Sequence, residues 1–238
     1  MNIIVKIIYY IIAGLLAFSL LFFQGKRYHQ KTVHTEMIKT TQTVKHLMQP
    51  VNEVIPPSNI EADFLKIYNN VAELKQDATI VVEGNVQSTE SFTYTPDPND
   101  KGSTSVYTKA KVQVTKVYKG DVKEGDVLTF VEPGGVATAE DVGMKEKFPD
   151  LDDKSLKEKI EYVFDGVPNM KANDKVLLFG DKGDIPLLKE KYYETIGTHM
   201  GKFTYHNGYF ARYVPEDMTD LKSLKMSTSM VQQQLLNI

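Results

Sequence analysis

The sequence contains no cysteine and no tryptophan, and neither sign of charge is in clear excess. The absence of cysteine excludes disulfide bonds, thiolate catalysis and cysteine-ligated zinc or iron–sulfur centres. The chain has 28 Lys and Arg against 31 Asp and Glu, a net charge of −3. It therefore lacks the bulk basic excess that nucleic-acid-binding proteins usually carry, and we expect no nucleic-acid partner.

The rest of the composition is that of a folded chain. Of the 238 residues, 42% are hydrophobic and 25% are charged, so the chain as a whole is not expected to be disordered. This length suits one domain of fair size or two small ones. The apolar residues, however, are concentrated at the N-terminus.

An apolar run extends from Ile3 to Phe23 and contains a single charge, at Lys6. As a helix it would be about 30 Å long, the thickness of the hydrocarbon core of a bilayer. We therefore predict a transmembrane helix within residues 1–25, with the lipid bilayer as its partner. The alternative, a cleaved signal peptide, needs small residues after the run, but the small pair at Ala17 and Ser19 lies inside it. An uncleaved signal anchor in a single-pass membrane protein is favoured.

Residues 26–57 are predicted to form a polar, basic stalk. The charges of this stalk bear on which side of the membrane the following domain lies. The positive-inside rule counts basic residues near the span, and Lys26, Arg27 and Lys31 would favour a cytoplasmic domain. The very short tail before the span is typical of export signals, and the domain that follows has the character of exported domains. We predict an extracytoplasmic domain and keep the cytoplasmic orientation as an alternative.

A folded domain is expected over residues 58–215. Ser58 and Glu61 have the spacing of a capping box, which predicts a helix from about Asn59 to Lys75. Beyond it the apolar pattern changes to a period of two, typical of strands. Strands are expected at residues 78–86, 106–118, 127–131, 175–179 and 192–196. A hairpin is expected over residues 202–213, because Asn-Gly at 207–208 is the preferred pair for a type I′ turn.

Two inserted segments interrupt these strands. Residues 88–105 are predicted to form a long polar loop, and residues 137–173 a second insertion that contains a helix at 152–164. Residues 216–238 are predicted to be a C-terminal tail with a short helix near 218–224. Loops on a β scaffold often carry binding residues, so both insertions are candidates for function.

The order of these expected helices, strands and turns resembles that in a known group of proteins. Four stretches carry the resemblance: ELKQDATIVVEGNV at 73–86, VQVTKVYKGDVKEGDVLTFVEPGG at 112–135, NDKVLLFG at 173–180 and GKFTYHNGYF at 201–210. They are similar to small extracytoplasmic β-domains of Gram-positive bacteria, usually lipoproteins or membrane-anchored proteins and mostly uncharacterised. This chain lacks the lipidated cysteine of the lipoproteins.

The resemblance implies an OB-like barrel similar to netrin and tissue-inhibitor-of-metalloproteinase modules. It does not imply inhibition, because those inhibitors use cysteines that this chain lacks. The expected fold class is therefore mainly β (α+β): an N-terminal transmembrane helix followed by an OB-like antiparallel β-barrel, with a packed N-terminal helix and an inserted helix. The matched motifs are turns and strands, so the resemblance implies fold and location and no reaction.

Motifs for catalysis, metals and cofactors are incomplete in this sequence. His34 lacks the second histidine of a zinc-protease helix motif. Gly120 and Gly125 have the glycine spacing of a phosphate-binding loop, but Asp126 stands where its lysine belongs. We therefore predict no catalytic residue, no metal ligand and no cofactor, and the protein is not expected to be an enzyme.

The candidate binding surface lies on the last hairpin. Aromatic side chains gather there and could stack sugars or bases, although packing in the core is the competing interpretation. The candidate surface residues are Phe203, Tyr205, Tyr209, His199 and His206.

The function expected from the sequence is that of a non-catalytic binding protein of the bacterial cell envelope. Its partner would be another envelope protein or the cell wall. Two alternatives stay open: an envelope hydrolase with its site in loops 88–105 and 137–173, and a membrane-tethered domain that faces the cytoplasm.

Overall fold

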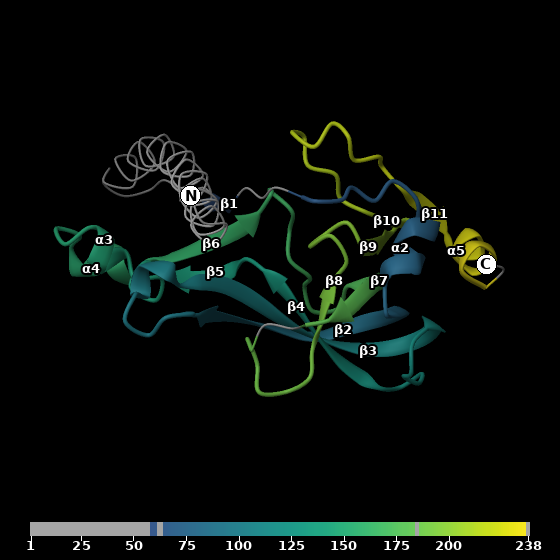
Figure 1. The fold of residues 1–238 in the computed structure, drawn as a ribbon, viewed down its shortest axis with the longest axis horizontal. Coiled ribbons are helices and arrows are strands. Elements are labelled where there is room, and N and C mark those ends of the chain that lie inside the picture. The colour runs from purple at the N-terminus through teal and green to yellow at the C-terminus, as the bar shows by residue number, and fades with distance from the viewer. Residues whose placement is uncertain (1–57, 61–63, 184–185, 237–238) are drawn as a thin grey trace, which may run out of the picture. The chain divides into compact units, whose positions relative to one another are not determined.

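The computed structural model describes residues 58–60, 64–183 and 186–236 (Figure 1). The chain divides into two units, Met1–Ile55 and Pro56–Ile238, and all described residues belong to the second. The predicted transmembrane helix and stalk therefore lie outside the described residues. Within the described part, no helix has both the length and the apolar character needed to cross a membrane.

The described chain consists mainly of β-strands, as predicted, with a few short helices. The strands are β1 (Ser58–Ile60), β2 (Ile80–Tyr94), β3 (Ser105–Lys119), β4 (Val127–Pro133), β5 (Gly135–Thr138), β6 (Lys159–Phe164), β7 (Lys175–Lys182), β8 (Tyr193–Thr195), β9 (Lys202–His206), β10 (Tyr209–Ala211) and β11 (Lys225–Ser227). The helices are α2 (Val71–Asp77), α3 (Met144–Lys147), α4 (Asp153–Lys157) and α5 (Thr228–Leu236), with a 3₁₀ turn η1 at Lys101–Ser103.

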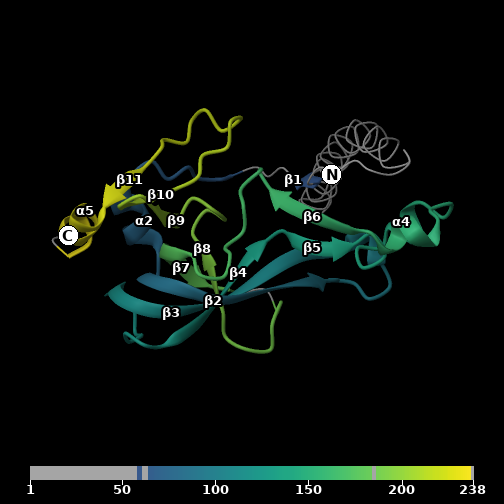
Figure 2. The same cartoon turned by 180° about the vertical axis from the view of Figure 1, so that it is seen from behind.

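The strands form two sheets, which Figures 1 and 2 show from opposite sides. The larger sheet has eight strands in the order β11-β10-β9-β7-β2-β3-β4-β8, and the smaller has three in the order β1-β6-β5. Most neighbours in the larger sheet are antiparallel, but β8 pairs parallel with β4. β8 also pairs antiparallel with β7, so this short strand contacts both β4 and β7.

The hairpin of β2 and β3 is longer than the sequence indicated. Each strand has 15 residues, and they pair from Val81 opposite Lys119 to Tyr94 opposite Ser105, with three register shifts between these ends. The predicted loop at 88–105 is therefore wrong over most of its first half, since β2 continues to Tyr94. That part of β2 is largely exposed and lacks the apolar alternation of a half-buried strand, so the period-two pattern could not reveal it.

The Asn-Gly hairpin is confirmed. β9 ends at His206 and β10 begins at Tyr209, and the two residues between them are Asn207 with φ 49° and Gly208 with φ 89°. Positive φ at both central positions is the requirement of a type I′ turn.

The predicted helix at 59–75 is wrong in its first part. Residues 58–60 form β1, which pairs parallel with β6, and the helix α2 begins only at Val71. Its N-cap is Asn70, whose side-chain oxygen accepts a hydrogen bond from the Glu73 N–H at 2.8 Å. Glu73 in turn accepts from the Asn69 N–H at 3.3 Å. Because a capping-box pattern also fits here, the local signal at Ser58 was not specific.

Two further helix predictions need correction. The expected helix at 152–164 is a short helix, α4, followed by the strand β6, and Leu156 and Ile160 from the two elements share one small apolar cluster. The helix expected near 218–224 is absent from the described chain, where turns lead into β11 and then α5. In both places apolar spacing compatible with a helix arises from tertiary packing of other elements.

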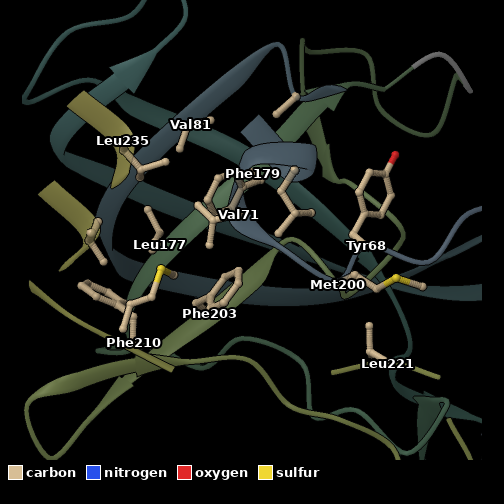
Figure 3. Close-up of a cluster of buried hydrophobic side chains, with 14 residues drawn as sticks. Tyr68, Val71, Val81, Leu177, Phe179, Met200, Phe203, Phe210, Leu221 and Leu235 are labelled. Carbon is tan, nitrogen blue, oxygen red and sulfur yellow. The ribbon is translucent and has the colours of Figure 1, made fainter. Parts of the chain in front are cut away.

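Two large apolar clusters lie on opposite faces of the central strands. One packs α2 and α5 against β7, β9 and β10, and Figure 3 shows Val71, Leu235, Phe179 and Phe203 in it. The other is formed by side chains of β2, β3, β4 and β7. Along β2, Val81 belongs to the first cluster and its neighbours Ile80 and Val82 to the second, because successive strand residues face opposite ways.

A glycine pair carries the chain from the larger sheet into the smaller one. Gly134, between β4 and β5, and Gly135, the first residue of β5, have φ of 92° and 142°. A Cβ atom on Gly134 would lie 2.6 Å from the backbone oxygen of Tyr162 in β6. The two sheets therefore approach closely beside the end of β4, where the site described next is found.

Candidate functional site

The structure separates the five residues of the predicted binding surface. Phe203 is fully buried in the apolar cluster of Figure 3, and His199 is also buried. Tyr205 is partly buried, with its ring centroid 5.1 Å from that of Phe210, whereas Tyr209 and His206 are exposed. His199 precedes β9 and His206 ends it, so these five residues do not form one surface.

A buried ion pair joins β4 to β9. The Lys202 Nζ atom donates a hydrogen bond to Glu132 Oε1, and both side chains are almost completely inaccessible to solvent. Each partner also bonds to the backbone of the connection between β6 and β7. Lys202 donates to the Pro168 carbonyl at 2.7 Å, and Glu132 accepts from the Met170 N–H at 2.7 Å. The pair therefore fastens this connection to the larger sheet.

His199 lies beside this ion pair. Its Nδ1 atom is 4.0 Å from Asp165 Oδ2, and its ring meets the Phe64 ring edge-on, with 5.5 Å between centroids. Within the described chain, neither nitrogen of the His199 ring has a hydrogen-bond partner. A buried imidazole without partners is unusual, because buried polar groups are nearly always hydrogen-bonded.

A second buried cation, Arg212, completes the polar surroundings of His199. Arg212 follows β10 and donates to the backbone carbonyls of Tyr68 at 2.6 Å and Met200 at 3.3 Å. It also donates to the Lys222 carbonyl at 3.2 Å. Arg212 thereby ties the segment before α2 and the segment before β11 to the turn that carries His199.

Burial controls the ionisation of this site. It lowers the pKa of His199 to about 4, and the positive charges of Lys202 and Arg212 lower it further. The imidazole is therefore neutral at pH 7. Burial likewise lowers the pKa of Arg212 to about 10, which leaves its guanidinium charged.

A small pocket opens beside His199. It has a volume of about 10 Å³, enough for one water molecule. We refer to it as the His199 pocket. Its lining residues are Glu132, Pro133, Phe164, Val167, Asn169, Thr198, His199 and Lys202. Thr198 has φ 61°, an uncommon conformation for a β-branched residue, so the turn that carries the pocket wall is strained.

A different group of side chains occupies the outer face of β2 and β3, with one member from the connection between β7 and β8. Phe92 and Tyr107 are paired across β2 and β3, with their rings stacked at 5.7 Å between centroids. Next to them on the same face, Lys109 pairs with Glu90 at 2.7 Å and Lys111 with Glu190 at 2.8 Å. We refer to these six residues as the outer face. Its two rings are partly exposed, and its charges are paired.

Metal ligands do not cluster in the part of the chain that the structure describes. No group of three or more His, Asp or Glu side chains is arranged there to hold a metal ion. His199 and Asp165 approach each other, while Glu132 is bonded to Lys202. The chemistry available at the pocket is therefore that of a neutral imidazole beside paired charges.

Sequence reasoning identified one member of this site, His199, and missed Glu132, Lys202, Asp165 and Arg212. One local signal was available, because Glu132 lies within an otherwise largely apolar stretch, residues 127–133, just before the glycine pair. A charged residue in such a stretch requires a partner if it is buried. The identity of that partner was not readable, since Lys202 is 70 residues away.

Comparison of the chain with protein-family models, curated proteins and solved structures found no match.

Proposed function

We propose that this protein is a membrane-anchored, non-catalytic binding protein of the bacterial cell envelope, with its β-domain outside the cytoplasm. The apolar run from Ile3 to Phe23 would provide the anchor. The domain would present the outer face to a ligand in the envelope. The stacked pair of Phe92 and Tyr107 beside two lysines is the observation that carries this proposal.

The strand pairings support an OB-like barrel as the fold of this domain. The strands β2, β3 and β4 pair in sequence, β4 pairs parallel with β8, β8 pairs with β7, and β7 pairs with β2. These five pairings connect in a ring, and a five-stranded, partly open barrel is the architecture of OB-folds. The strands β5 and β6 of the smaller sheet would then be an insertion between the third and fourth strands of the barrel, and β1, which precedes the barrel, pairs with this insertion.

An OB-like fold would make the outer face a candidate ligand-binding surface. OB-folds bind oligonucleotides and oligosaccharides on the face of their second and third strands and on the adjoining loops. Here β3 and β4 take those places, and the outer face has three residues on β3, one of which, Lys111, is bonded to Glu190 of the connection between β7 and β8. A net charge of −3 argues against a nucleic acid, so a carbohydrate of the cell wall is the ligand we favour.

The chemistry of the outer face suits a carbohydrate. The apolar faces of sugar rings pack on aromatic rings, and paired lysine and carboxylate groups supply donors and acceptors for hydroxyl groups. If the ligand were another envelope protein, we would expect a larger apolar patch on this face of the domain.

The His199 pocket does not carry a hydrolase proposal. An envelope hydrolase was the alternative, with its site built by loops 88–105 and 137–173. Phe164, Val167 and Asn169 of the second segment line the pocket, but no residue of the first does. The enclosed part of the pocket also admits only one water-sized group.

Binding to purified cell-wall sacculi tests the proposal. We expect Tyr107→Leu to weaken co-sedimentation of the detergent-solubilised full chain with sacculi roughly fivefold, because a ring contact worth about 1 kcal/mol is lost while apolar packing is kept. Lys111→Ala is expected to weaken binding as well, since Lys111 lies on the same face. Affinities measured over a series of sacculus concentrations provide the comparison.

The matched control is Lys123→Ala, an exposed lysine in the turn between β3 and β4 and outside the outer face. Equal losses for Lys111→Ala and Lys123→Ala would show non-specific charge attraction. If the wild-type chain does not sediment with sacculi but cross-links to one envelope protein through the outer face, the ligand is that protein and the carbohydrate proposal is wrong.

Protease treatment of intact protoplasts tests the proposed location. We expect added protease to remove the domain of residues 58–236 from intact cells while a cytoplasmic marker protein stays whole. Protection of the domain until the membrane is permeabilised would establish the opposite orientation, which the basic residues Lys26 and Arg27 favour.

A further inference from the structure

The geometry points to a second binding site, the His199 pocket, which takes a single neutral hydroxyl group. The pocket is separate from the outer face, and the inference does not depend on the proposed carbohydrate ligand. Three observations carry it: the unpartnered nitrogens of His199, the size of the pocket and the balance of charge around it.

The first observation concerns hydrogen bonding. His199 is 5% exposed, it lines the pocket, and neither ring nitrogen has a partner within the described chain. A neutral imidazole has one nitrogen that donates and one that accepts. A buried polar group left in this state is destabilising, so a guest that bonds to the ring is favoured.

The second observation is the size of the pocket. A volume of about 10 Å³ accommodates one water-sized group and excludes a phosphate or a carboxylate with its substituents. A hydroxyl both donates and accepts, so it can bond to whichever nitrogen of His199 faces the pocket. Lys202, which also lines the pocket, gives hydrogen bonds to Glu132 and Pro168 and has a third ammonium hydrogen that a hydroxyl oxygen can accept.

The third observation is charge. The negative groups around the pocket are Glu132 and Asp165, and the positive groups are Lys202 and Arg212. Two charges of each sign favour neither a cation nor an anion. A neutral group is therefore the preferred guest.

Water and the alcohol group of a larger ligand share this chemistry, and magnetic resonance can distinguish them. The probes are water and methanol, added to the detergent-solubilised full chain at pH 7. The readouts are nuclear Overhauser contacts to the His199 ring protons and the shifts of its ring nitrogens. The signals are assigned by their absence in His199→Gln, with His206→Gln, a change at an exposed histidine, as the matched control.

We expect a long-lived water contact at the His199 ring that methanol displaces, with shifts confined to His199 among the histidines of the domain. Formate at the same concentration is expected to shift His199 at least tenfold less than methanol. A water contact that methanol does not displace supports the hydroxyl site with water as its guest. A His199 ring without a water or methanol contact, or one that responds to formate as strongly as to methanol, would overturn the inference.

Discussion

Replacing Glu132 with Gln is expected to lower the free energy of unfolding by about 3–5 kcal/mol. The change leaves the Lys202 ammonium buried without its counter-ion, since the two side chains are only 3% and 7% exposed. Removal of one partner from a buried ion pair is far more destabilising than the pair itself is stabilising, because the remaining charge is desolvated and uncompensated. Denaturant unfolding of the full chain, followed by tyrosine fluorescence, measures the loss.

The double variant Glu132→Gln with Lys202→Gln separates this effect from packing. It removes both charges and keeps amide groups that can bond to the Met170 N–H and the Pro168 carbonyl. We expect it to be more stable than Glu132→Gln alone by about 1–3 kcal/mol. The control is Glu190→Gln, which breaks the half-exposed pair with Lys111 and is expected to cost less than about 1 kcal/mol. Equal losses for Glu132→Gln and Glu190→Gln would refute the role given to the buried pair.

The parts of the fold that sequence reasoning predicted are those with local causes. The Asn207-Gly208 turn requires positive φ at two adjacent residues, and this requirement is visible in two letters of sequence. The residues of β3 alternate between buried and more exposed positions because one face of the strand is covered, as at Ala110 and Val112. Such features need no knowledge of distant segments.

The parts that were missed depend on distant segments. β1 is a strand because it pairs with β6, about a hundred residues later in the chain, as the bond from the Gly166 N–H to Asn59 Oδ1 illustrates. The outer half of β2 is a strand because β3 lies beside it. A glutamate or lysine is the same residue type on a surface and in a core. The burial of Glu132 and Lys202 was therefore not predictable from composition or from the period of the apolar pattern. The candidate site therefore depends on the fold, which brings Glu132 of β4 next to Lys202 of β9.

The free energy of unfolding is expected to fall by about 3 kcal/mol between pH 6.5 and pH 4 because of His199 alone. An unfolded histidine has a pKa of about 6.5, whereas burial beside Lys202 and Arg212 lowers the pKa of His199 to about 4 in the folded domain. As the pH falls through this window, the unfolded state binds the proton and the folded state does not, so acid favours unfolding. Well below pH 4 both states are protonated and the effect is complete.

The groups that face His199 decide whether this acid sensitivity is as large as expected. Lys202 and Arg212 oppose its protonation, and Asp165, at 4.0 Å, is the group that would favour it. The measurement is the pH dependence of unfolding in the full chain with and without His199→Gln, because the difference between the two curves removes the contributions of the carboxylates. We expect His199→Gln to flatten the curve between pH 6.5 and pH 4, whereas His206→Gln, at an exposed position, leaves it unchanged. Parallel curves for the wild-type chain and His199→Gln would mean that Asp165 stabilises the imidazolium enough to cancel burial, and that His199 does not make the domain sensitive to acid.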